Sequence, residues 1–260
     1  MAWRSARTSC NAAVSCRVAL FALLGCVVDA FAAHPLLTED TGTQGVGKLE
    51  LELGNARTRD QGDRLYEFAP QLSYGVLPNL DAIARPTWVD SRTTTEAGVQ
   101  RARGAGDAAL DIKWRFYEAE GLSFGARAGV NAPVGDADRG LGAGTATYHA
   151  LSIMSIDAAP WAVHANLAYT RNRAHPAERR NLYRASAAAL WSFSKRWQLL
   201  LADLAVDTNI DRSRSAALAV ARVGAICTIK PGFDIDVGWQ FRLNRAAPVQ
   251  VLLAAATLRW

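Results

Sequence analysis

The chain ends with Leu252-Leu253-Ala254-Ala255-Ala256-Thr257-Leu258-Arg259-Trp260, in which every second residue, from Leu252 to Trp260, is apolar. Successive side chains of a β-strand point to opposite faces, so this segment would present one wholly apolar face. The same period recurs in Phe233-Asp234-Ile235-Asp236-Val237-Gly238-Trp239-Gln240-Phe241-Arg242, whose other face carries charge. Strands of outer-membrane barrels alternate lipid-facing and lumen-facing residues in this way. The pattern predicts an all-β chain that forms a transmembrane, up-and-down antiparallel β-barrel.

A targeting segment precedes the predicted barrel. Arg4, Arg7 and Arg17 come before an apolar run, 18–28, that is followed by the small residues around Ala30-Phe31-Ala32. This order of features is typical of a secretory signal peptide, here residues 1–32. Its removal lowers the formal charge of the chain from +5 to +3, because one acidic residue leaves with the three arginines. The exported chain is therefore only weakly basic.

Composition excludes several other classes of protein. Cys227 is the one cysteine outside the signal peptide, so no intramolecular disulfide can form in the exported chain. Lys and Arg do not cluster among aromatic residues, which argues against a nucleic-acid partner. After residue 33 no apolar run approaches the roughly 20 residues that a membrane-spanning helix needs. If the chain spans a membrane, it does so with strands.

Two-residue alternation predicts about twelve strands, an even number that suits a barrel with both termini in the periplasm. Segment 145–156 alternates poorly, and segments 183–193 and 216–229 are rich enough in alanine to resemble helices. A helix would scatter Tyr183 and Trp191 around its circumference, so strands are favoured. The predicted strands are 48–54, 65–76, 80–89, 107–117, 122–132, 145–156, 161–170, 183–193, 198–206, 216–229, 233–242 and 252–260.

The connections between these strands alternate in length, as expected for long outer loops and short periplasmic turns. The long ones are 55–63, 90–106, 133–144, 171–181, 207–215 and 244–248, and the short ones are 77–79, 118–121, 157–160, 194–196 and 230–232. Pro70 and Pro86 fall within predicted strands although proline cannot donate a ladder hydrogen bond. We expect bulges or distorted pairing at both.

Outward aromatic residues should gather at the two membrane interfaces. The predicted outer belt contains Tyr66, Phe68, Trp88, Tyr169, Tyr183, Trp239 and Phe241. The predicted periplasmic belt contains Trp114, Phe116, Trp161, Trp191, Phe193, Phe233 and Trp260. Trp260 closes the last strand, which we expect to pair with the first around 49–53, and we predict that its ring is needed for barrel assembly.

Charged residues on the strands are predicted to face the lumen, because an Arg or Lys that faces lipid at the midplane costs roughly 2–4 kcal/mol. The lumen-facing candidates are Glu50, Glu52, Glu67, Arg85, Asp107, Asp111, Lys113, Arg115, Arg127, Arg184, Asp203, Arg222, Asp234, Asp236 and Arg242. Positive and negative charges nearly balance, which disfavours a pore selective for one sign of ion and fits a neutral or amphipathic cargo. Equally, these charges could simply pair and hold the barrel together.

Several segments resemble a known family. His34-Pro35-Leu36-Leu37-Thr38-Glu39-Asp40-Thr41-Gly42-Thr43-Gln44-Gly45 follows the predicted cleavage site, and Gly106-Asp107, Ala132-Pro133-Val134-Gly135-Asp136 and Gly140-Leu141-Gly142-Ala143-Gly144 come later. Together they resemble the family described as putative MetA-pathway of phenol degradation, with Val134 where threonine is more usual. The resemblance implies an outer-membrane barrel that passes hydrophobic or aromatic compounds. It brings no catalytic residues.

The sequence therefore predicts a channel or transporter for small hydrophobic or aromatic molecules, in the outer membrane of a Gram-negative bacterium. A structural or surface-interaction barrel is the first alternative. A lipid-modifying enzyme is less favoured, because His149 and Ser152 would face opposite sides of one strand and His164 with Asn166 lacks a nearby nucleophile. No cofactor or metal is predicted.

The expected partners are outer-membrane lipid and lipopolysaccharide, the barrel-assembly machinery and a small hydrophobic solute, with no nucleic acid. Residues 48–260 would form the barrel and residues 33–47 a periplasmic lead-in. The lead-in is expected either to be disordered or to tuck into the periplasmic mouth as a small plug.

Overall fold

The structure is a computed structural model that describes residues 34–60, 62–95, 98–172 and 177–260. The predicted signal peptide, 1–32, lies outside the described residues. The strands are β1 (Leu49–Asp60), β2 (Asp63–Leu77), β3 (Leu80–Arg85), β4 (Trp88–Thr95), β5 (Gly98–Ala105), β6 (Ala108–Ala119), β7 (Leu122–Ala132), β8 (Thr147–Ala158), β9 (Trp161–Arg171), β10 (Asn181–Ser192), β11 (Trp197–Asp207), β12 (Leu218–Lys230), β13 (Phe233–Arg242) and β14 (Gln250–Arg259), with a 3-10 helix η1 (Ala137–Arg139). Within the described ranges, no helix is long and apolar enough to cross a membrane.

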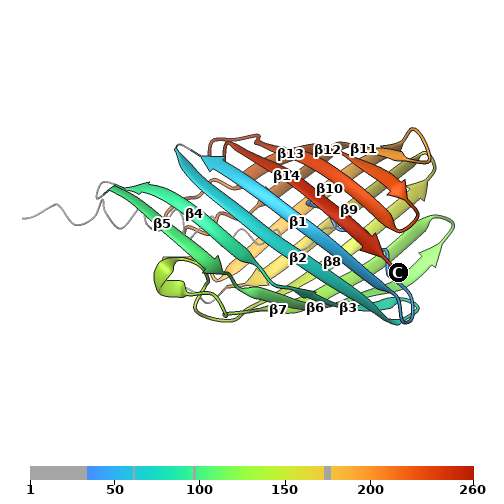
Figure 1. The fold of residues 1–260 in the computed structure, drawn as a ribbon, viewed down its shortest axis with the longest axis horizontal. Helices are drawn as coiled ribbons and strands as arrows, with labels where there is room; N and C mark the ends of the chain where they lie inside the picture. Colours follow the sequence, from blue (N-terminus) through green and yellow to red (C-terminus); the bar gives the residue numbers. More distant parts are fainter. Residues whose placement is uncertain (1–33, 61, 96–97, 173–176) are drawn as a thin grey trace, which may run out of the picture.

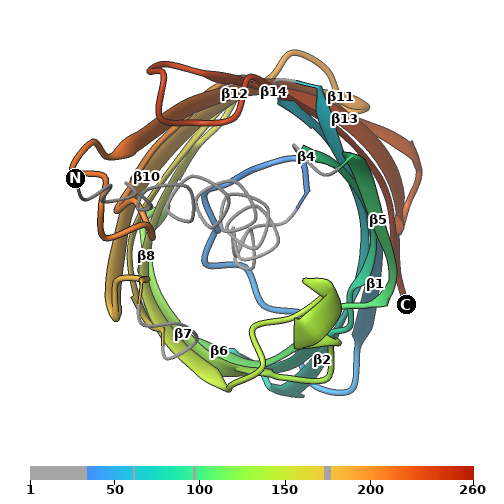
Figure 2. The same ribbon diagram turned by 90° about the vertical axis from the view of Figure 1, so that its left-hand side faces the viewer.

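The strands form one closed antiparallel sheet. It closes because β1 pairs with both β14 and β2. β3 and β4 both pair with β2 and form one wall strand interrupted at 86–87, and β5 and β6 form another interrupted at 106–107. The wall of the barrel thus has twelve strands, which surround a central lumen (Figures 1 and 2).

The predicted fold class is confirmed. Segments 145–156, 183–193 and 216–229 are strands, and the last strand pairs with the first: Glu50 lies opposite Arg259. Leu49 and Trp260 then exchange two backbone hydrogen bonds, with N···O distances of 2.9 and 3.1 Å. The last strand thus closes the barrel against the first, as predicted.

Two predicted loops are wrong. Residues 55–60 continue β1, which pairs with β2 as far as Asp60 opposite Asp63. Residues 90–95 and 98–105 form a hairpin of β4 and β5 that extends beyond the end of the barrel (Figure 1). Neither segment has a wholly apolar face. Apolar alternation, which reports contact with lipid on one face, does not mark such strands.

The two prolines lie opposite one another. The register of β2 with β3 and with β4 places Pro70 opposite Pro86, with both residues in the part of the chain that the structure describes. No pairing joins 69–71 to 85–87 among these described residues. We call this unpaired stretch, 69–71 with 85–87, the proline seam. The expected distortion is therefore present, and it is shared by the two positions.

Outward aromatic rings meet across neighbouring strands at both ends of the barrel. Tyr169 and Tyr183 form one ring pair, with centroids 5.4 Å apart, near the outer ends of β9 and β10. Trp161 and Trp191 form another, 6.1 Å apart, near the opposite ends of the same strands. The two ring pairs lie at opposite ends of β9 and β10, as expected for aromatic belts at two membrane interfaces.

Candidate functional site

The first described residues lie inside the barrel. We call residues 34–44 the inner segment; it runs around the inner wall (Figure 2). From its start to its end it hydrogen-bonds in turn to side chains of β13, β11, β9, β8 and β3. The segment predicted as a periplasmic lead-in thus occupies the lumen from residue 34.

Asp203 of β11 holds the inner segment near the middle of the barrel. Its carboxylate accepts hydrogen bonds from the backbone N–H groups of Leu37 and Thr38, the second at 3.1 Å, and from the Thr38 hydroxyl at 2.6 Å. Thr38 and Asp203 are both fully buried. A buried carboxylate is tolerated when such donors satisfy it, so these contacts tie the segment firmly to the wall.

Two further wall residues bind the backbone of the inner segment. Arg222 of β12 donates to the carbonyl oxygens of Pro35 and Leu36, at 3.2 and 2.9 Å. Asn166 of β9 accepts from the N–H of Glu39 at 2.6 Å and donates to its carbonyl oxygen at 2.9 Å. Side chains of the wall thus satisfy backbone groups of the inner segment.

A buried cluster of charges surrounds Glu39. The ammonium of Lys113 lies 2.6 Å from Glu39 Oε1 and 3.3 Å from Asp40 Oδ1. The guanidinium of Arg127 lies 2.9 Å from Glu39 Oε2 and 2.7 Å from Asp111 Oδ2. Lys113 lowers the pKa of Asp40 to about 2, so Asp40 is ionised at neutral pH. Two cations of the wall thus bind the inner segment through its anions.

Asp111 also contacts His149, and a glycine makes room for it. Asp111 Oδ1 is hydrogen-bonded to His149 Nε2, and neither side chain is exposed. A Cβ atom at Gly129 would lie 1.9 Å from Asp111 Oδ1. The missing side chain at 129 therefore allows the carboxylate to reach both Arg127 and His149.

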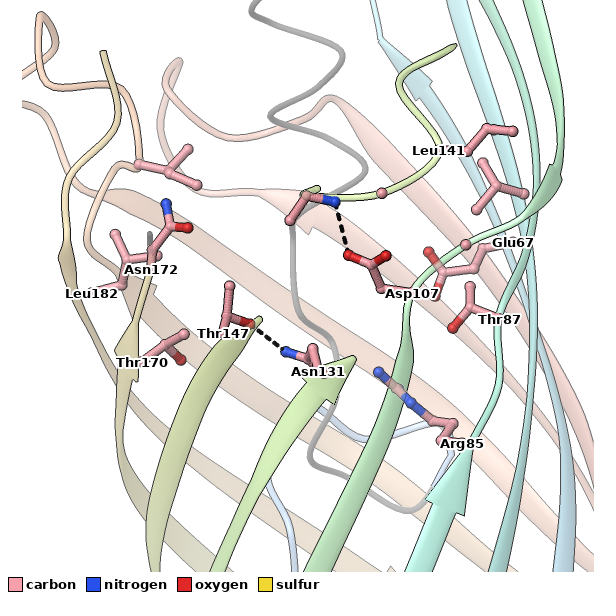
Figure 3. Close-up of a pocket in the computed structure, with 15 residues that line it drawn as sticks. Glu67, Arg85, Thr87, Asp107, Asn131, Leu141, Thr147, Thr170, Asn172 and Leu182 are labelled. Atoms are coloured by element: carbon pink, nitrogen blue, oxygen red, sulfur yellow. Dashed lines mark hydrogen bonds between the residues drawn. The ribbon is translucent and has the colours of Figure 1, made fainter. Parts of the chain in front are cut away.

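Outside the inner segment lies a cavity that we call the outer vestibule (Figure 3). The space between its lining residues is about 650 Å³, a figure that includes open solvent. Its lining is Glu67, Arg85, Thr87, Val89, Gly106, Asp107, Asn131, Leu141, Gly142, Ala143, Thr147, Thr170, Asn172, Leu182 and Ile210. The mixture of apolar surface and a few polar groups suits a small amphipathic molecule.

Asp107 folds the loop between β7 and β8 over the vestibule. Its carboxylate accepts from the backbone N–H of Gly135 at 3.0 Å and of Ala143 at 2.8 Å. A Cβ at Gly142 would lie 2.4 Å from Asp107 Oδ1, so glycine is required for this approach. The loop then buries Leu141 against Leu65 and Val89. Three of the four segments on which the family resemblance rests, 106–107, 132–136 and 140–144, thus meet at one carboxylate.

Replacing Asp107 with alanine is expected to loosen this loop. Two backbone N–H groups lose their acceptor, at a cost of about 1–3 kcal/mol. Cleavage by trypsin after Arg139, which is exposed in the loop, should accelerate about tenfold or more. Asp138→Ala, at an exposed carboxylate in the same loop, is the control. Equal cleavage rates in the two variants would show that Asp107 does not hold the loop.

The structure places the predicted lumen-facing residues in four groups. Asp111, Lys113 and Arg127 are in the charge cluster, and Glu52, Asp203, Arg222 and Asp236 contact the inner segment. Glu67, Arg85 and Asp107 line the vestibule. Near the barrel ends, Arg259 bridges Glu50 and Asp234, Arg184 pairs with Asp207 at 2.5 Å, Arg115 pairs with Glu118 at 3.2 Å, and Arg242 is exposed. Their roles in transport stay predictions.

The residues that sequence reasoning missed lie on the inner segment and opposite it. Glu39, Thr38 and Thr41 are buried, although they belong to no strand whose alternation could indicate an inward face. Their only signal was the family-like segment that contains them. Among the wall residues, Ser155 was also missed: its hydroxyl contacts His164 Nδ1 at 2.8 Å and accepts from the N–H of Thr41 at 3.1 Å.

Of the two groupings of possible catalytic residues, one is separated in the structure and the other has a hydroxyl beside its histidine. Ser152 is exposed on the outside of β8 whereas His149 is buried inside, as the spacing predicted. Asn166, on the same face as His164, binds the inner segment. The prediction that His164 lacks a nearby nucleophile is wrong, because the buried Ser155 hydroxyl lies 2.8 Å from His164 Nδ1. Over the described ranges, no group of His, Cys, Asp and Glu residues could hold a metal ion.

A closed antiparallel barrel with lipid-facing aromatic belts and a charged interior defines the class of outer-membrane β-barrels. The family model described as "Putative MetA-pathway of phenol degradation" matches residues 35–260. The chain belongs to this family. No curated protein matches the sequence.

Solved structures show the same fold at low sequence identity. An outer membrane channel from Pseudomonas putida F1 aligns with a TM-score of 0.66 at 14% identity, over 85% of this chain and 98% of that one. The transport unit of the autotransporter AIDA-I from Escherichia coli gives 0.57 at 9% identity, over 94% and 97%. The KdgM porin gives 0.56 at 6% identity, over 80% and 98%. At these identities the likeness establishes the fold.

Proposed function

We propose that this barrel is a passive channel of the Gram-negative outer membrane for small hydrophobic or aromatic molecules. The observation that carries the proposal is the outer vestibule, a partly apolar cavity at the mouth of a barrel whose lumen is otherwise crossed by a buried segment. The family is named for phenol degradation, and the similar protein from Pseudomonas putida is described as an outer membrane channel. Both descriptions fit passage of small aromatic compounds.

The charges of the interior support an uncharged cargo. In the described structure, Lys113 and Arg127 are engaged by carboxylates at less than 3 Å rather than arranged as a ring of like charge. An ion-selective pore needs such a ring of exposed like charges. Here the charges bind the inner segment, which leaves recognition of the solute to the vestibule.

Export and assembly complete the proposal. Residues 1–32 would direct secretion, and the barrel-assembly machinery would insert the chain among lipid and lipopolysaccharide. The protein would need no cofactor and catalyse no reaction. The alternative, a barrel with a purely structural or surface role, is favoured by the packing of the inner segment against the wall. Solute passage decides between the two.

The test uses a dye that reports entry into the outer membrane. N-phenyl-1-naphthylamine is small, aromatic and uncharged; it is excluded by lipopolysaccharide and fluoresces in hydrocarbon. Cells that express the barrel are expected to take up the dye several times faster than cells with an empty vector. Susceptibility to a large hydrophilic antibiotic serves as the control for general leakage and should not change. Equal dye uptake with and without the barrel would refute the channel and favour the structural role.

A further inference from the structure

We propose that four arginines on the outside of the barrel form a binding site for the phosphate groups of lipopolysaccharide. The residues are Arg59 of β1, Arg64 of β2, Arg92 of β4 and Arg101 of β5, and we call them the arginine row. The site concerns the lipid around the barrel, so it does not depend on what the lumen carries. It follows from the register of four strands, from the charges around the row and from its height above the aromatic belt.

The register brings the four arginines side by side. Arg59 lies opposite Arg64, and Arg64 lies opposite Arg92. Arg92 in turn lies opposite Arg101 in the β4–β5 hairpin. These four strands are neighbours at the outer end of the barrel (Figure 1). Neighbouring strands are about 4.8 Å apart, so the row crosses the sheet within about 14 Å.

The row faces the outside of the barrel. All four arginines are exposed. The residues beside three of them along the strands, Thr58, Leu65 and Thr93, are buried and belong to the inner face. Because successive side chains alternate between the two faces, the arginines project from the face that carries the lipid-facing residues farther along the same strands.

The row lies just beyond the outer aromatic belt. Phe68 and Trp88 form an opposite pair of the predicted belt, and Arg64 and Arg92 follow four residues farther out on the same face. At about 3.3 Å per residue and a strand tilt of about 40°, the arginines lie about 10 Å above the rings along the membrane normal. Belt aromatics sit at the level of the headgroups. The row is therefore at the height of the phosphates and acidic sugars of lipopolysaccharide, outside the acyl chains.

The protein does not compensate the charge of the row. Two further arginines, Arg57 and Arg103, lie on the same face two residues nearer the membrane. The one carboxylate of this face among the described residues is Asp90, which lies 3.9 Å from Arg103. Arg103 also lies 6.0 Å from the centroid of the Trp88 ring. Within the ranges that the structure describes, no carboxylate pairs with a member of the row.

An anion from outside the chain would remove this repulsion. Side chains directly opposite one another have Cβ atoms about 5 Å apart, and like charges at that distance destabilise a sheet. Arginine binds phosphate through two parallel N–H donors, so two neighbouring members of the row can hold one phosphate between them. The row thus gains stability from a phosphorylated ligand.

The surroundings of the row favour a lipid over a soluble polyanion. Below the belt, the same outer face continues with exposed apolar side chains such as Leu72 and Leu110. A ligand that fits the whole face has acyl chains beside these residues and phosphates at the arginines. Lipopolysaccharide, the lipid of the outer leaflet, has this arrangement.

Native mass spectrometry of the purified barrel in detergent measures the binding. The probe is deep-rough lipopolysaccharide, which keeps lipid A and the inner acidic sugars. Arg64→Gln with Arg92→Gln removes the two central members of the row and should weaken binding about tenfold or more, the loss expected for two charge-assisted contacts. The control is Lys195→Gln with Arg196→Gln, two exposed residues of the turn at the opposite end of the barrel. It removes the same charge and should keep the affinity of the parent protein.

Other ligands and a conservative variant identify the chemistry. Lipopolysaccharide freed of its phosphates should bind the parent as weakly as the probe binds the glutamine variant. Phosphatidylglycerol, which has one phosphodiester, should bind about tenfold more weakly than the probe or worse. Millimolar inorganic phosphate should not displace the probe. Arg64→Lys with Arg92→Lys keeps the charge but loses the paired donors, so its affinity should fall between those of the parent and the glutamine variant.

Thermal unfolding provides a second readout. In detergent without lipopolysaccharide, the glutamine variant should unfold at a temperature no lower than that of the parent, because like charges no longer face one another. Added probe should raise the unfolding temperature of the parent and of the control variant, but raise that of the glutamine variant much less. Altered migration on gels after heating verifies that each variant is folded.

Each other result overturns the site. Equal affinity of the parent and the glutamine variant would show that the row does not bind the probe. Equal binding of phosphatidylglycerol and the probe, or displacement by inorganic phosphate, would show a general anion surface only. Binding of heparin without binding of the probe would assign the row to a soluble polyanion. Dye uptake by the glutamine variant should match the parent, so a failure of the channel function leaves this test unaffected.

Discussion

Replacing Arg127 with methionine is expected to lower the free energy of unfolding by about 3–5 kcal/mol, because one partner of a buried ion pair leaves the others uncompensated. Arg127 is fully buried and contacts Glu39, Asp111 and Gln71. Methionine has a similar length but no donor. Glu39 then keeps only Lys113 as its cation, and Asp111 keeps only His149. The inner segment thus loses one of the two wall cations that bind Glu39.

Two measurements check this prediction. Urea titration, followed by tryptophan fluorescence, gives the free energy of unfolding. Planar-bilayer recording should show longer and more frequent conducting events than in the parent protein, since the inner segment is held less firmly. Arg115→Met is the control: Arg115 pairs with an exposed Glu118, so its loss should cost about 1 kcal/mol or less. An Arg127 variant that is as stable and as closed as this control would contradict the attachment described.

Replacing Trp260 with aspartate is expected to reduce the amount of folded barrel severalfold, before any change in transport per molecule. Trp260 is 61% exposed on the lipid side, and its backbone closes the sheet through two hydrogen bonds with Leu49. An aromatic ring stabilises a strand end at the membrane interface, whereas a charged carboxylate draws that end into water. The closing pair of strands would then form less readily.

The folded fraction is measured on gels of outer membranes, where a folded barrel migrates differently before and after heating. Trp260→Phe keeps an aromatic ring and should retain most of the folded protein. Dye uptake, divided by the folded amount, should be the same for both variants and the parent. A normal yield of the aspartate variant would mean that closure of β1 on β14 does not depend on the ring.

The wall of the barrel was predictable because a residue that faces lipid must be apolar and a charged residue must face the lumen. Arg127 and Asp111 could be directed inward from the cost of exposing charge to hydrocarbon, and both are buried in the lumen. The cost of exposing charge to hydrocarbon applies only to the part of the wall that lies in the membrane. Beyond it, the strands of the β4–β5 hairpin have no wholly apolar face, and their sequence carries no apolar alternation.

The inner segment was less predictable because its contacts are distant in sequence. Arg127 binds Glu39 across 88 positions, and Asp203 binds Thr38 across 165. A side chain outside regular structure has no period that reveals which way it points. Pro70 and Pro86 show the intermediate case: each predicted a local disturbance, but only the register could show that they face one another.

The path of the inner segment also sets the order in which the molecule is built. Residues near the start of the exported chain find their partners on its last strands: His34 binds Asp236, 202 positions later, and Leu37 binds Asp203. These sites exist only after β11 and β13 have joined the wall. The first residues of the inner segment can therefore complete their contacts only when those late strands are in place. An assembly intermediate that lacks β11 and β13 lacks the contacts of His34 and Leu37 with Asp236 and Asp203.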